Sequence, residues 1–538
     1  MFTKRISRFL FSIGAVCLFA AFTHCAFGQR AVVPLPSLDS TNGTSAWLYS
    51  DPTLVKYVSQ PGEEPYLAVS NPSSLNKPAV SAALDLPLDK VRGCLVFVSV
   101  FVRVSNVSEP AQSYLGVKAM VHVASPSNAD TWDQAPGNGN GVYPLTYDWT
   151  KESFQTSVPE DAANANLSLG LQGSTGEADF RDLIVSVIRP QMSKVVRTGP
   201  VFTGHGPGSL RGCMISTDIQ PSDVATLARW HVNLVRWQIN DSHFPHPLAD
   251  TEDAAAFDAW LNKDLAHLDQ LLPYFKAAGI LVALDLHTSP GGDNASAVNR
   301  IFVDQLWEQH FIDVWEMMAK RYKNERQIWG YDLVNEPITP GIGNGVIGWH
   351  DLAEKTARAV RKIDPFHAII IEPDPGGGVA KLAYLQPIDV PGVVYEVHMY
   401  DPSQFTFQGV NGSDPKAVTY PGIIGGQKWD VDRIRREFQP VVDFAKNNNV
   451  HIYVGEFSTA RWTPGGDKWL ADVISVLEEN HWDWTYHAFR EWQGWSAEIG
   501  EDPAVITPSP TPTARLLVLQ AAYSKDKPET VRTVAPPK

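Results

Sequence analysis

Short apolar segments alternate with amphipathic ones through the larger, C-terminal part of this chain, and this alternation restricts the possible fold more than any other feature. Eight segments have the length and apolar content of buried strands: Leu210–Ser216, Val232–Trp237, Ile280–Leu286, Ile328–Val334, Ala368–Pro373, Val393–His398, His451–Gly455 and Trp484–Phe489. Between them, apolar residues recur at helical spacing, as at Leu261, Leu265, Leu268 and Leu272. Eight strand–helix alternations in about 325 residues are what a (β/α)8 TIM barrel requires. We therefore predict an α/β fold, with a barrel over residues 193–525.

The preceding segment, residues 29–192, has the pattern of an all-β domain. Cys94–Val104 is almost continuous valine, leucine and phenylalanine, as in a strand buried on both faces, and Leu167, Leu169 and Leu171 alternate with polar residues. Clusters of glycine, asparagine, proline and serine punctuate these runs, and no strong helical pattern interrupts them. We predict a β-sandwich of the jelly-roll type in front of the barrel.

The first 28 residues have the organisation of a secretory signal peptide. Basic residues near the start precede an apolar run, Phe9–Phe22, that is too short to span a bilayer comfortably. Ala26-Phe27-Gly28 then offers small residues at the −3 and −1 positions of a cleavage site. We expect a signal peptide over residues 1–28 and secretion to the extracellular space or the periplasm. The alternative is an uncleaved anchor, and no later stretch is long and apolar enough to cross a membrane.

Net charge and cysteine content argue against some classes of partner and cofactor. The chain has 538 residues and a net charge of −15, and loss of the basic signal would make it more acidic still. An acidic balance argues against nucleic acid as a partner and suits a neutral substrate. Cys94 and Cys213 are expected to be buried free thiols, and no residue pattern calls for a metal or another cofactor. We expect a monomer that ends in a charged, proline-containing tail over residues 526–538.

Two glutamates stand at the ends of predicted strands, where active sites form in this type of barrel. The fourth strand runs into Asn335-Glu336-Pro337 and the seventh into Gly455-Glu456-Phe457. Side-chain alternation turns Glu336 and Glu456 toward the inside of the barrel. A retaining glycosidase needs two carboxyl groups about 5–5.5 Å apart, one to protonate the leaving oxygen and one to attack the anomeric carbon. One glutamate at a strand end is more often a capping or solvated residue, so the pair is what indicates a catalytic site.

The order of these motifs resembles glycoside hydrolase family 5, the cellulase family, over residues 200–525. Asn335-Glu336-Pro337 resembles its acid/base motif, and Gly455-Glu456-Phe457 resembles its nucleophile motif. The resemblance implies that Glu336 is the acid/base and Glu456 the nucleophile. It also implies a set of substrate-site positions at other strand ends: Arg236, His287, Asn335, His398 and Tyr400.

The same resemblance implies roles for three of these residues. Arg236 would support the nucleophile electrostatically, Tyr400 would hydrogen-bond it, and Asn335 would bond the sugar 2-hydroxyl. Four more acids lie on predicted strands, and we interpret them as ion-pair or hydrogen-bond partners low in the barrel: Asp285, Asp332, Glu372 and Glu396.

The eighth strand departs from the family pattern, because His487 stands where the family usually has a tryptophan under the −1 sugar. Trp492, in the loop that follows, is a candidate replacement. Aromatic faces stack on pyranose rings, and loops at this end of the barrel set specificity. We therefore expect Trp492 and Trp462 to contact substrate.

The N-terminal domain resembles carbohydrate-binding jelly-roll modules at Leu169–Gly173 and Ala178–Leu183. Four aromatic residues are candidates for a glycan-binding platform: Trp132, Tyr143, Tyr147 and Trp149. A purely structural domain that docks on the barrel is the alternative.

These features predict a secreted retaining glycosidase that cleaves a β-linked polysaccharide or oligosaccharide by double displacement. The resemblance favours an endo-β-1,4-glucanase. β-Mannanase, β-1,3-glucanase and exo-β-glycosidase activities of the same family stay open, as does transglycosylation through the same intermediate. A barrel that binds glycan without cleaving it is the alternative from a different functional class. Loop geometry decides among them, and specificity cannot be read from the motifs alone.

Overall fold

A computed structural model describes most of the chain. The described residues are 31–39, 46–112, 114–126, 128–135, 143–188, 198–240, 254–292, 299–339, 346–410 and 418–525. The predicted signal peptide (1–28), the predicted domain boundary near residue 192 and the predicted tail (526–538) lie outside these ranges. Within the described part, no helix is both long and apolar enough to cross a membrane.

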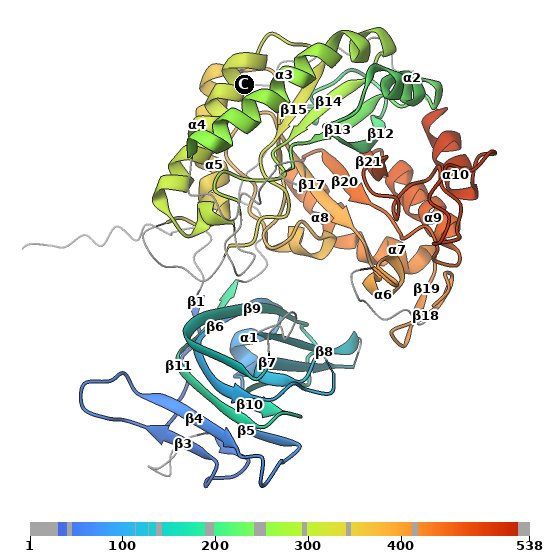
Figure 1. The fold of residues 1–538 in the computed structure, drawn as a ribbon. Helices are drawn as coiled ribbons and strands as arrows, with labels where there is room; N and C mark the ends of the chain where they lie inside the picture. The colour runs from blue at the N-terminus through green and yellow to red at the C-terminus, as the bar shows by residue number, and fades with distance from the viewer. Residues whose placement is uncertain are drawn as a thin grey trace, which may run out of the picture.

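The N-terminal domain is a sandwich of two antiparallel sheets, as the alternating pattern predicted (Figure 1). One sheet has the order β3 (Val55–Val58), β4 (Tyr66–Asn71), β11 (Gly176–Ile188), β6 (Cys94–Val107) and β9 (Leu145–Val158), with β1 (Ala31–Val32) beside β11. The other has the order β2 (Leu48–Tyr49), β5 (Ala79–Asp85), β10 (Asn164–Gln172), β7 (Gly116–Ser125) and β8 (Asn128–Ala135).

Side-chain alternation builds the core between these sheets. Every second residue of β6 points inward, and Val98, Val100 and Val102 are at most 1% exposed. Leu167 and Leu169 of β10 meet them from the opposite sheet, in the same buried cluster. A short helix, α1 (Leu88–Val91), leads into β6. The domain therefore has its own hydrophobic core, separate from that of the barrel.

The C-terminal domain is a closed barrel of parallel strands, and each strand lies where the sequence predicted one. Its strands in order are β12 (Arg211–Ser216), β13 (Leu234–Gln238), β14 (Leu281–Asp285), β15 (Ile328–Asp332), β16 (Ala368–Ile371), β17 (Val393–Met399), β20 (Ile452–Phe457) and β21 (Asp483–Phe489). Residues of all eight strands are buried almost without exception, as expected for strands covered on both sides.

Helices form the outer layer of the barrel. They are α2 (Pro221–Arg229), α3 (Ala254–Ala278), α4 (Gln305–Tyr322), α5 (Trp349–Ile363), α7 (Val431–Glu437), α8 (Gln439–Asn448), α9 (Gly466–Glu479) and α10 (Ala514–Tyr523), with a 3-10 turn, η3 (Arg300–Phe302), before α4. The leucines of α3 that recur at helical spacing are buried against the strands. Two helices, α7 and α8, follow one another before β20, and Pro440 lies in the first turn of α8, where its missing N–H costs no hydrogen bond.

One connection of the barrel differs from the simple strand–helix alternation. Between β16 and β17 the chain forms only a 3-10 helix, η4 (Val379–Tyr384). After β17 it forms a short helix, α6 (Ser403–Thr406), and a hairpin of β18 (Gly422–Ile424) and β19 (Gln427–Trp429).

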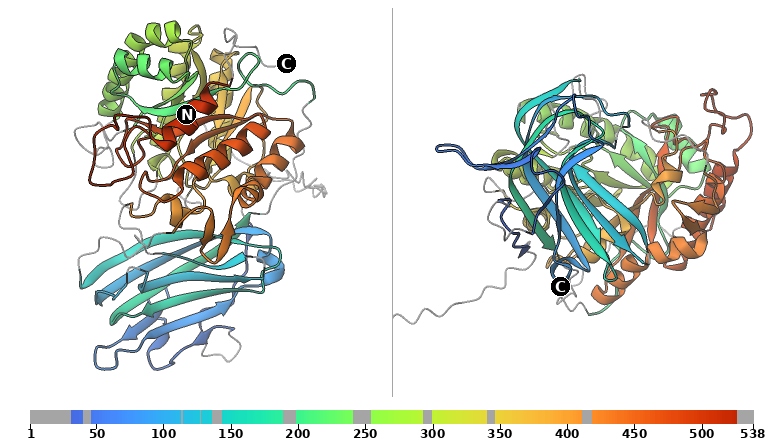
Figure 2. Two further views of the ribbon diagram at one scale, coloured as in Figure 1. Left: turned by 90° about the vertical axis from the view of Figure 1, so that its right-hand side faces the viewer. Right: turned by 90° about the horizontal axis from the view of Figure 1, so that it is seen from below.

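The sandwich lies at the end of the barrel from which α6 and the β18–β19 hairpin project (Figures 1 and 2). A direct contact joins the domains there, because Lys381 Nζ of η4 donates to Ser157 Oγ of β9 at 3.3 Å. This end of the barrel is the one formed by the carboxyl ends of its strands. Cys94 in the sandwich and Cys213 in the barrel are buried thiols that form no disulfide, as predicted.

Candidate active site

The two candidate catalytic glutamates come together at the carboxyl ends of β15 and β20. Glu456 lies on β20 and is 4% exposed, whereas the side chain of Glu336, just beyond β15, is 42% exposed. A carboxylate oxygen of each lies within 4.8 Å of the other and of a ring nitrogen of His398. Glu336 has a positive φ of 42°, and its backbone N–H donates to Glu372 Oε2 at 3.0 Å. The loop that carries Glu336 is therefore fixed to the neighbouring strand end.

Glu456 is surrounded by hydrogen-bond donors and positive charge. Arg236 Nη1 donates to Oε1 at 2.6 Å, and the Tyr400 hydroxyl donates to Oε2 at 2.7 Å. His487 Nδ1 lies 3.3 Å and His398 Nδ1 3.8 Å from Oε2. Burial alone would raise the pKa of Glu456, but the charges of His398, His487 and Arg236 hold that pKa well below its usual range. The carboxylate is therefore ionised.

Arg236, on β13, is the centre of the charge network beneath Glu456. It is fully buried, and its Nε donates to Asp332 Oδ2 at 2.8 Å. Its Nη2 contacts Glu372 Oε1 at 3.2 Å and Asp285 Oδ1 at 3.3 Å. Burial opposes the charge of the guanidinium, yet the surrounding carboxylates keep its pKa well above the ordinary value. Glu396 Oε1 also lies 3.4 Å from Arg236 Nε. A buried charge requires such partners, so the four acids are ion-pair partners low in the barrel, as predicted.

Asn335 and His287 complete the predicted set around this network. Asn335 Oδ1 accepts from Arg236 Nη2 at 3.2 Å, which fixes the amide next to Glu336. His287 Nδ1 contacts Asp285 Oδ2 at 2.9 Å, and its other ring nitrogen lies 3.2 Å from Gln238 Nε2. Asp285 therefore links the His287 ring to the same arginine that contacts Glu456.

His398, on β17, connects both glutamates to the deeper acids. Its Nδ1 lies 2.9 Å from Glu336 Oε1, and its Nε2 lies 3.3 Å from Glu396 Oε1 and 3.5 Å from Glu372 Oε1. Burial would lower the pKa of His398, but Glu372 and Glu456 raise it well above its usual value. A charged ring donates from both nitrogens, so His398 fixes the orientation of Glu336.

Two glycines leave room for the deeper acids. A Cβ at Gly455 would lie 1.4 Å from Glu396 Oε1, and a Cβ at Gly377 would lie 2.3 Å from Glu372 Oε2. Gly377 also has a φ of 66°, which favours glycine. Position 455 therefore requires glycine, because the carboxylate of Glu396 on the neighbouring strand, β17, leaves no space for a side chain there.

His487 takes the inward position on β21 that the sequence register gave it, and it is a charged group beside Glu456. Its Nδ1 contacts the Tyr400 hydroxyl, and its Nε2 lies 2.7 Å from Glu491 Oε2. Burial lowers the pKa of His487, but Glu456 and Glu491 together raise it to about 10. Glu491 was missed by sequence reasoning, because it lies in the loop after β21, where no local period links it to His487.

Aromatic side chains form one wall beside Tyr400. The wall comprises Phe407, Trp462, Trp492 and Trp495, packed with Val410 and Ala460. Trp462 meets Trp492 edge to face at 6.0 Å between ring centroids, and its Nε1 donates to Gln408 O at 2.7 Å. Trp462 and Trp492 are each half-buried, so both predicted contact residues belong to this wall and keep an exposed part.

The four aromatic candidates of the sandwich do not form one platform. Trp132 of β8 is 57% exposed and stacks on His122 of β7 at 4.8 Å, on the outer face of the five-stranded sheet. Trp149 belongs to the other sheet, and the guanidinium groups of Arg103 and Arg181 lie 4.6 Å and 4.3 Å from the centroid of its ring. Trp132 and Trp149 therefore lie on different sheets, and two arginines already contact the ring of Trp149.

Three groups of histidines and carboxylates among the described residues have a spacing that could hold a metal ion. Two of them share His398 and belong to the site above, where Arg236 and the histidines already neutralise the acids. The third is His205, His451 and Asp483. It lies at the opposite end of the barrel, where the strands begin.

Comparison with known proteins gives matches to the barrel. The family model named cellulase, glycosyl hydrolase family 5, matches residues 206–493. Endoglucanase C of Acetivibrio thermocellus is 26% identical over 290 residues, which cover 49% of this chain and 81% of that protein. An endoglucanase of Paenibacillus polymyxa is 28% identical over 239 residues, covering 41% and 56% respectively. Endoglucanase Cel5A of Thermotoga maritima, a solved structure, aligns at 22% identity with a TM-score of 0.45 and covers 58% of this chain and 96% of its own.

Proposed function

The chain belongs to the cellulase family, glycosyl hydrolase family 5, and we propose that it is a retaining endo-β-1,4-glucanase. It is a glycosidase that acts on O-glycosyl bonds, as the family and the endoglucanase relatives establish. The observation that supports the retaining mechanism is the pair Glu336 and Glu456, whose carboxylate oxygens lie within 4.8 Å of one another. This spacing is shorter than the separation of about 6.5–9.5 Å in inverting glycosidases and supports the retaining geometry. Glu456 is buried among positive charges, whereas the side chain of Glu336 is partly exposed.

Glu456 is the proposed nucleophile. Its carboxylate is ionised, buried and aimed by Arg236 and Tyr400. In the first step a carboxylate oxygen bonds to the anomeric carbon while the bond from that carbon to the leaving oxygen breaks. The product of this step is a glycosyl ester of Glu456 and a free chain end.

Glu336 is the proposed acid/base. Its more exposed carboxyl is held at one oxygen by His398, which leaves the other for the leaving glycosidic oxygen. Glu336 gives its proton to that oxygen in the first step. In the second step, Glu336 takes a proton from a water whose oxygen bonds to the anomeric carbon, while the ester bond to Glu456 breaks and returns that carboxylate.

The remaining proposed roles concern substrate position. Asn335, fixed by Arg236, is placed to bond the 2-hydroxyl of the sugar next to the cleaved bond. His287 and His398 are the other polar contacts, and Trp462 and Trp492 are the proposed stacking surfaces. We also propose that the enzyme acts outside the cytoplasm, because its first 28 residues resemble a secretory signal. We propose that it acts there as a monomer.

The test is reducing-sugar release from a panel of soluble β-1,4-glucan, β-1,3-glucan, mannan and xylan, with chain-length analysis of the products. We expect release from β-1,4-glucan with a rapid fall in chain length, and loss of release in Glu456→Ala. Release of single sugars without a fall in chain length would replace the endo assignment by an exo one. Longer oligomers would indicate transglycosylation, and release by Glu456→Ala equal to wild type would refute the mechanism.

A further inference from the structure

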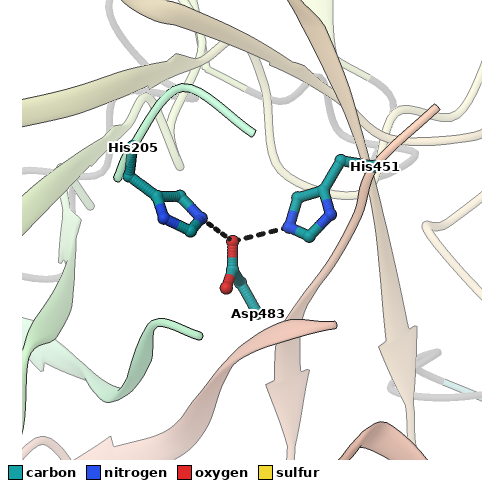
Figure 3. Close-up of side chains that lie close together, drawn as sticks. All are labelled: His205, His451 and Asp483. Atoms are coloured by element: carbon teal, nitrogen blue, oxygen red, sulfur yellow. Dashed lines mark hydrogen bonds and ion pairs between the residues drawn. The ribbon is translucent and has the colours of Figure 1, made fainter. Parts of the chain in front are cut away.

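A second cluster of chemically active side chains lies at the base of the barrel, where its strands begin. Asp483 is the first residue of β21, His451 immediately precedes β20, and His205 lies in the loop before β12. All three are buried, and Asp483 is fully buried. Figure 3 shows both imidazole rings directed at one oxygen of Asp483.

The geometry of this cluster is set by its hydrogen bonds. His205 Nε2 lies 2.8 Å and His451 Nε2 2.6 Å from the same atom, Asp483 Oδ2. The other carboxylate oxygen, Oδ1, accepts from the Leu210 backbone N–H at 2.7 Å. His205 Nδ1 lies 2.7 Å from the carbonyl oxygen of Gly206.

The last of these contacts restricts what lies between His205 and Asp483. A carbonyl oxygen only accepts, so Nδ1 of His205 carries the hydrogen. In a neutral ring the lone pair of Nε2 is then directed at a carboxylate oxygen, which also carries only lone pairs. A positive species must therefore lie between them, and it is either a second proton on the ring or a metal ion. Orientation of a ligating histidine by a backbone carbonyl at its other nitrogen is usual in metal sites.

The base of the barrel also gives an ion and a water molecule a route to the cluster. A hollow of about 1000 Å³ opens beside it, and both His205 and His451 line that hollow. Lys446 and His481 line the same hollow, and His481 is exposed. Solvent in the hollow therefore meets the histidines at the edge of the cluster.

We propose that His205 Nε2, His451 Nε2 and an oxygen of Asp483 bind one divalent transition-metal ion of the Zn²⁺ class, with water from the hollow as the fourth ligand. Two histidines, one carboxylate and an open position form an ordinary donor set for Zn²⁺. Ligand atoms on a tetrahedral ion with bonds of about 2.0–2.1 Å lie about 3.3 Å apart. The two nitrogen–oxygen contacts would therefore open by about half to three quarters of an ångström when the ion binds.

The consequence is structural and independent of the proposed hydrolytic mechanism. His205 and His451 come from segments that precede the first and seventh strands of the barrel, and Asp483 begins the last strand. One ion would join them, and because the unfolded chain does not hold these residues together, binding would stabilise the folded barrel.

The experiment is titration of the metal-stripped full chain with ZnCl₂, followed by calorimetry and by thermal unfolding. We expect about one tightly bound equivalent per chain and a rise in Tm of about 2–5 °C. Co²⁺ in the same site should give the visible absorption of a four-coordinate ion, which reports the ligand set without reference to activity. His451→Gln and Asp483→Asn should abolish the tight step, and His481→Gln, on the rim of the same hollow, should keep it.

Two results would overturn the proposal. One is the absence of a tight step in the wild-type chain, which would leave His205 as a doubly protonated ring. The other is a tight step that persists in His451→Gln but disappears in Glu336→Gln, because the ion would then be at the barrel mouth. If Asp483→Asn does not fold, His451→Gln decides the matter, since the His451 ring lies at the edge of the hollow.

Discussion

The two ends of this barrel each bury carboxylates beside histidines, but they balance the charges differently. At the mouth, five acids surround Arg236, and His398 and His487 lie beside them: Asp285, Asp332, Glu372, Glu396 and Glu456. At the base, Asp483 alone is shared by two histidines and a backbone N–H. Among the buried atoms described, Asp285 Oδ1, Asp332 Oδ1 and Glu396 Oε2 make no hydrogen bond, whereas Asp483 has both oxygens engaged.

The difference shows what each end is arranged to do. Burial, together with the neighbouring acids, raises the pKa values of Asp332 and Glu372 well above normal. The pKa of Glu456, a few ångströms away, is held well below normal. At the mouth, burial therefore opposes the charge of the deep acids beside a carboxylate whose charge is stabilised, whereas at the base the single acid has both oxygens engaged.

The largest effect should follow removal of the proposed nucleophile. Glu456→Gln keeps the size of the side chain but cannot form the ester, so kcat/KM should fall by about 10⁴-fold or more. Steady-state kinetics on the best polymer measure this fall. Glu479→Gln, a surface glutamate paired with Arg435, is the matched control and should leave kcat/KM unchanged. A fall of less than tenfold in Glu456→Gln would contradict the proposal that the mouth, and not the base, carries the catalytic carboxylate.

Loss of the central arginine should have the next largest effect. Arg236→Met leaves several buried acids without their cation, and breaking such a network costs about 3–5 kcal/mol of unfolding free energy. Denaturant unfolding at neutral pH measures the loss. The loss should shrink at acidic pH, where the acids become protonated. Arg358→Met, at an exposed pair with Glu354, should cost far less. Equal losses for the two variants would contradict the charge balance proposed for the mouth.

His487 is the next test of the charge balance at the mouth, because it places positive charge beside the proposed nucleophile, Glu456. His487→Gln removes that charge, so the pKa of Glu456 should rise and the acid limb of the kcat/KM profile should move to higher pH. We expect kcat/KM to fall by about 10–100-fold at neutral pH. His481→Gln, far from the mouth, is the control. An unchanged acid limb would show that His487 only fills space.

The smallest effect should come from another well-satisfied acid. Asp364 accepts from Tyr331 Oη at 2.6 Å and from the Phe366 N–H at 2.8 Å. Burial opposes its charge, but His367 and Tyr331 lower its pKa to about 2. Its contribution to stability is therefore present above the ordinary pKa of aspartate and is lost as pH falls toward 2. Asp364→Asn should cost about 1–3 kcal/mol at pH 7 and less at pH 3, measured by denaturant unfolding. A loss that grew on acidification would contradict this sign.

Local patterns predicted most of the fold and part of the site. The barrel strands were visible because buried parallel strands are short and apolar, and Glu336 and Glu456 were visible because strand ends converge at one face. The contacts of His487 with Glu491 could not be read, since Glu491 lies in a loop whose path depends on tertiary packing. Nor could the meeting of His205 with Asp483, because 278 residues separate them and no local period links them. The stacking of Arg103 and Arg181 on Trp149 likewise depends on pairing between distant strands.

The short connection η4 has a consequence for anyone who wishes to express the barrel alone. Lys381 and Tyr384 of η4 face the sandwich, and burial lowers the pKa of Lys381 and raises that of Tyr384. A truncation that starts at the barrel would uncover this surface at the thinnest part of the helical layer. We therefore expect such a fragment to be less soluble and to fold in lower yield than the two-domain chain, unless polar residues replace the surface that the sandwich covers.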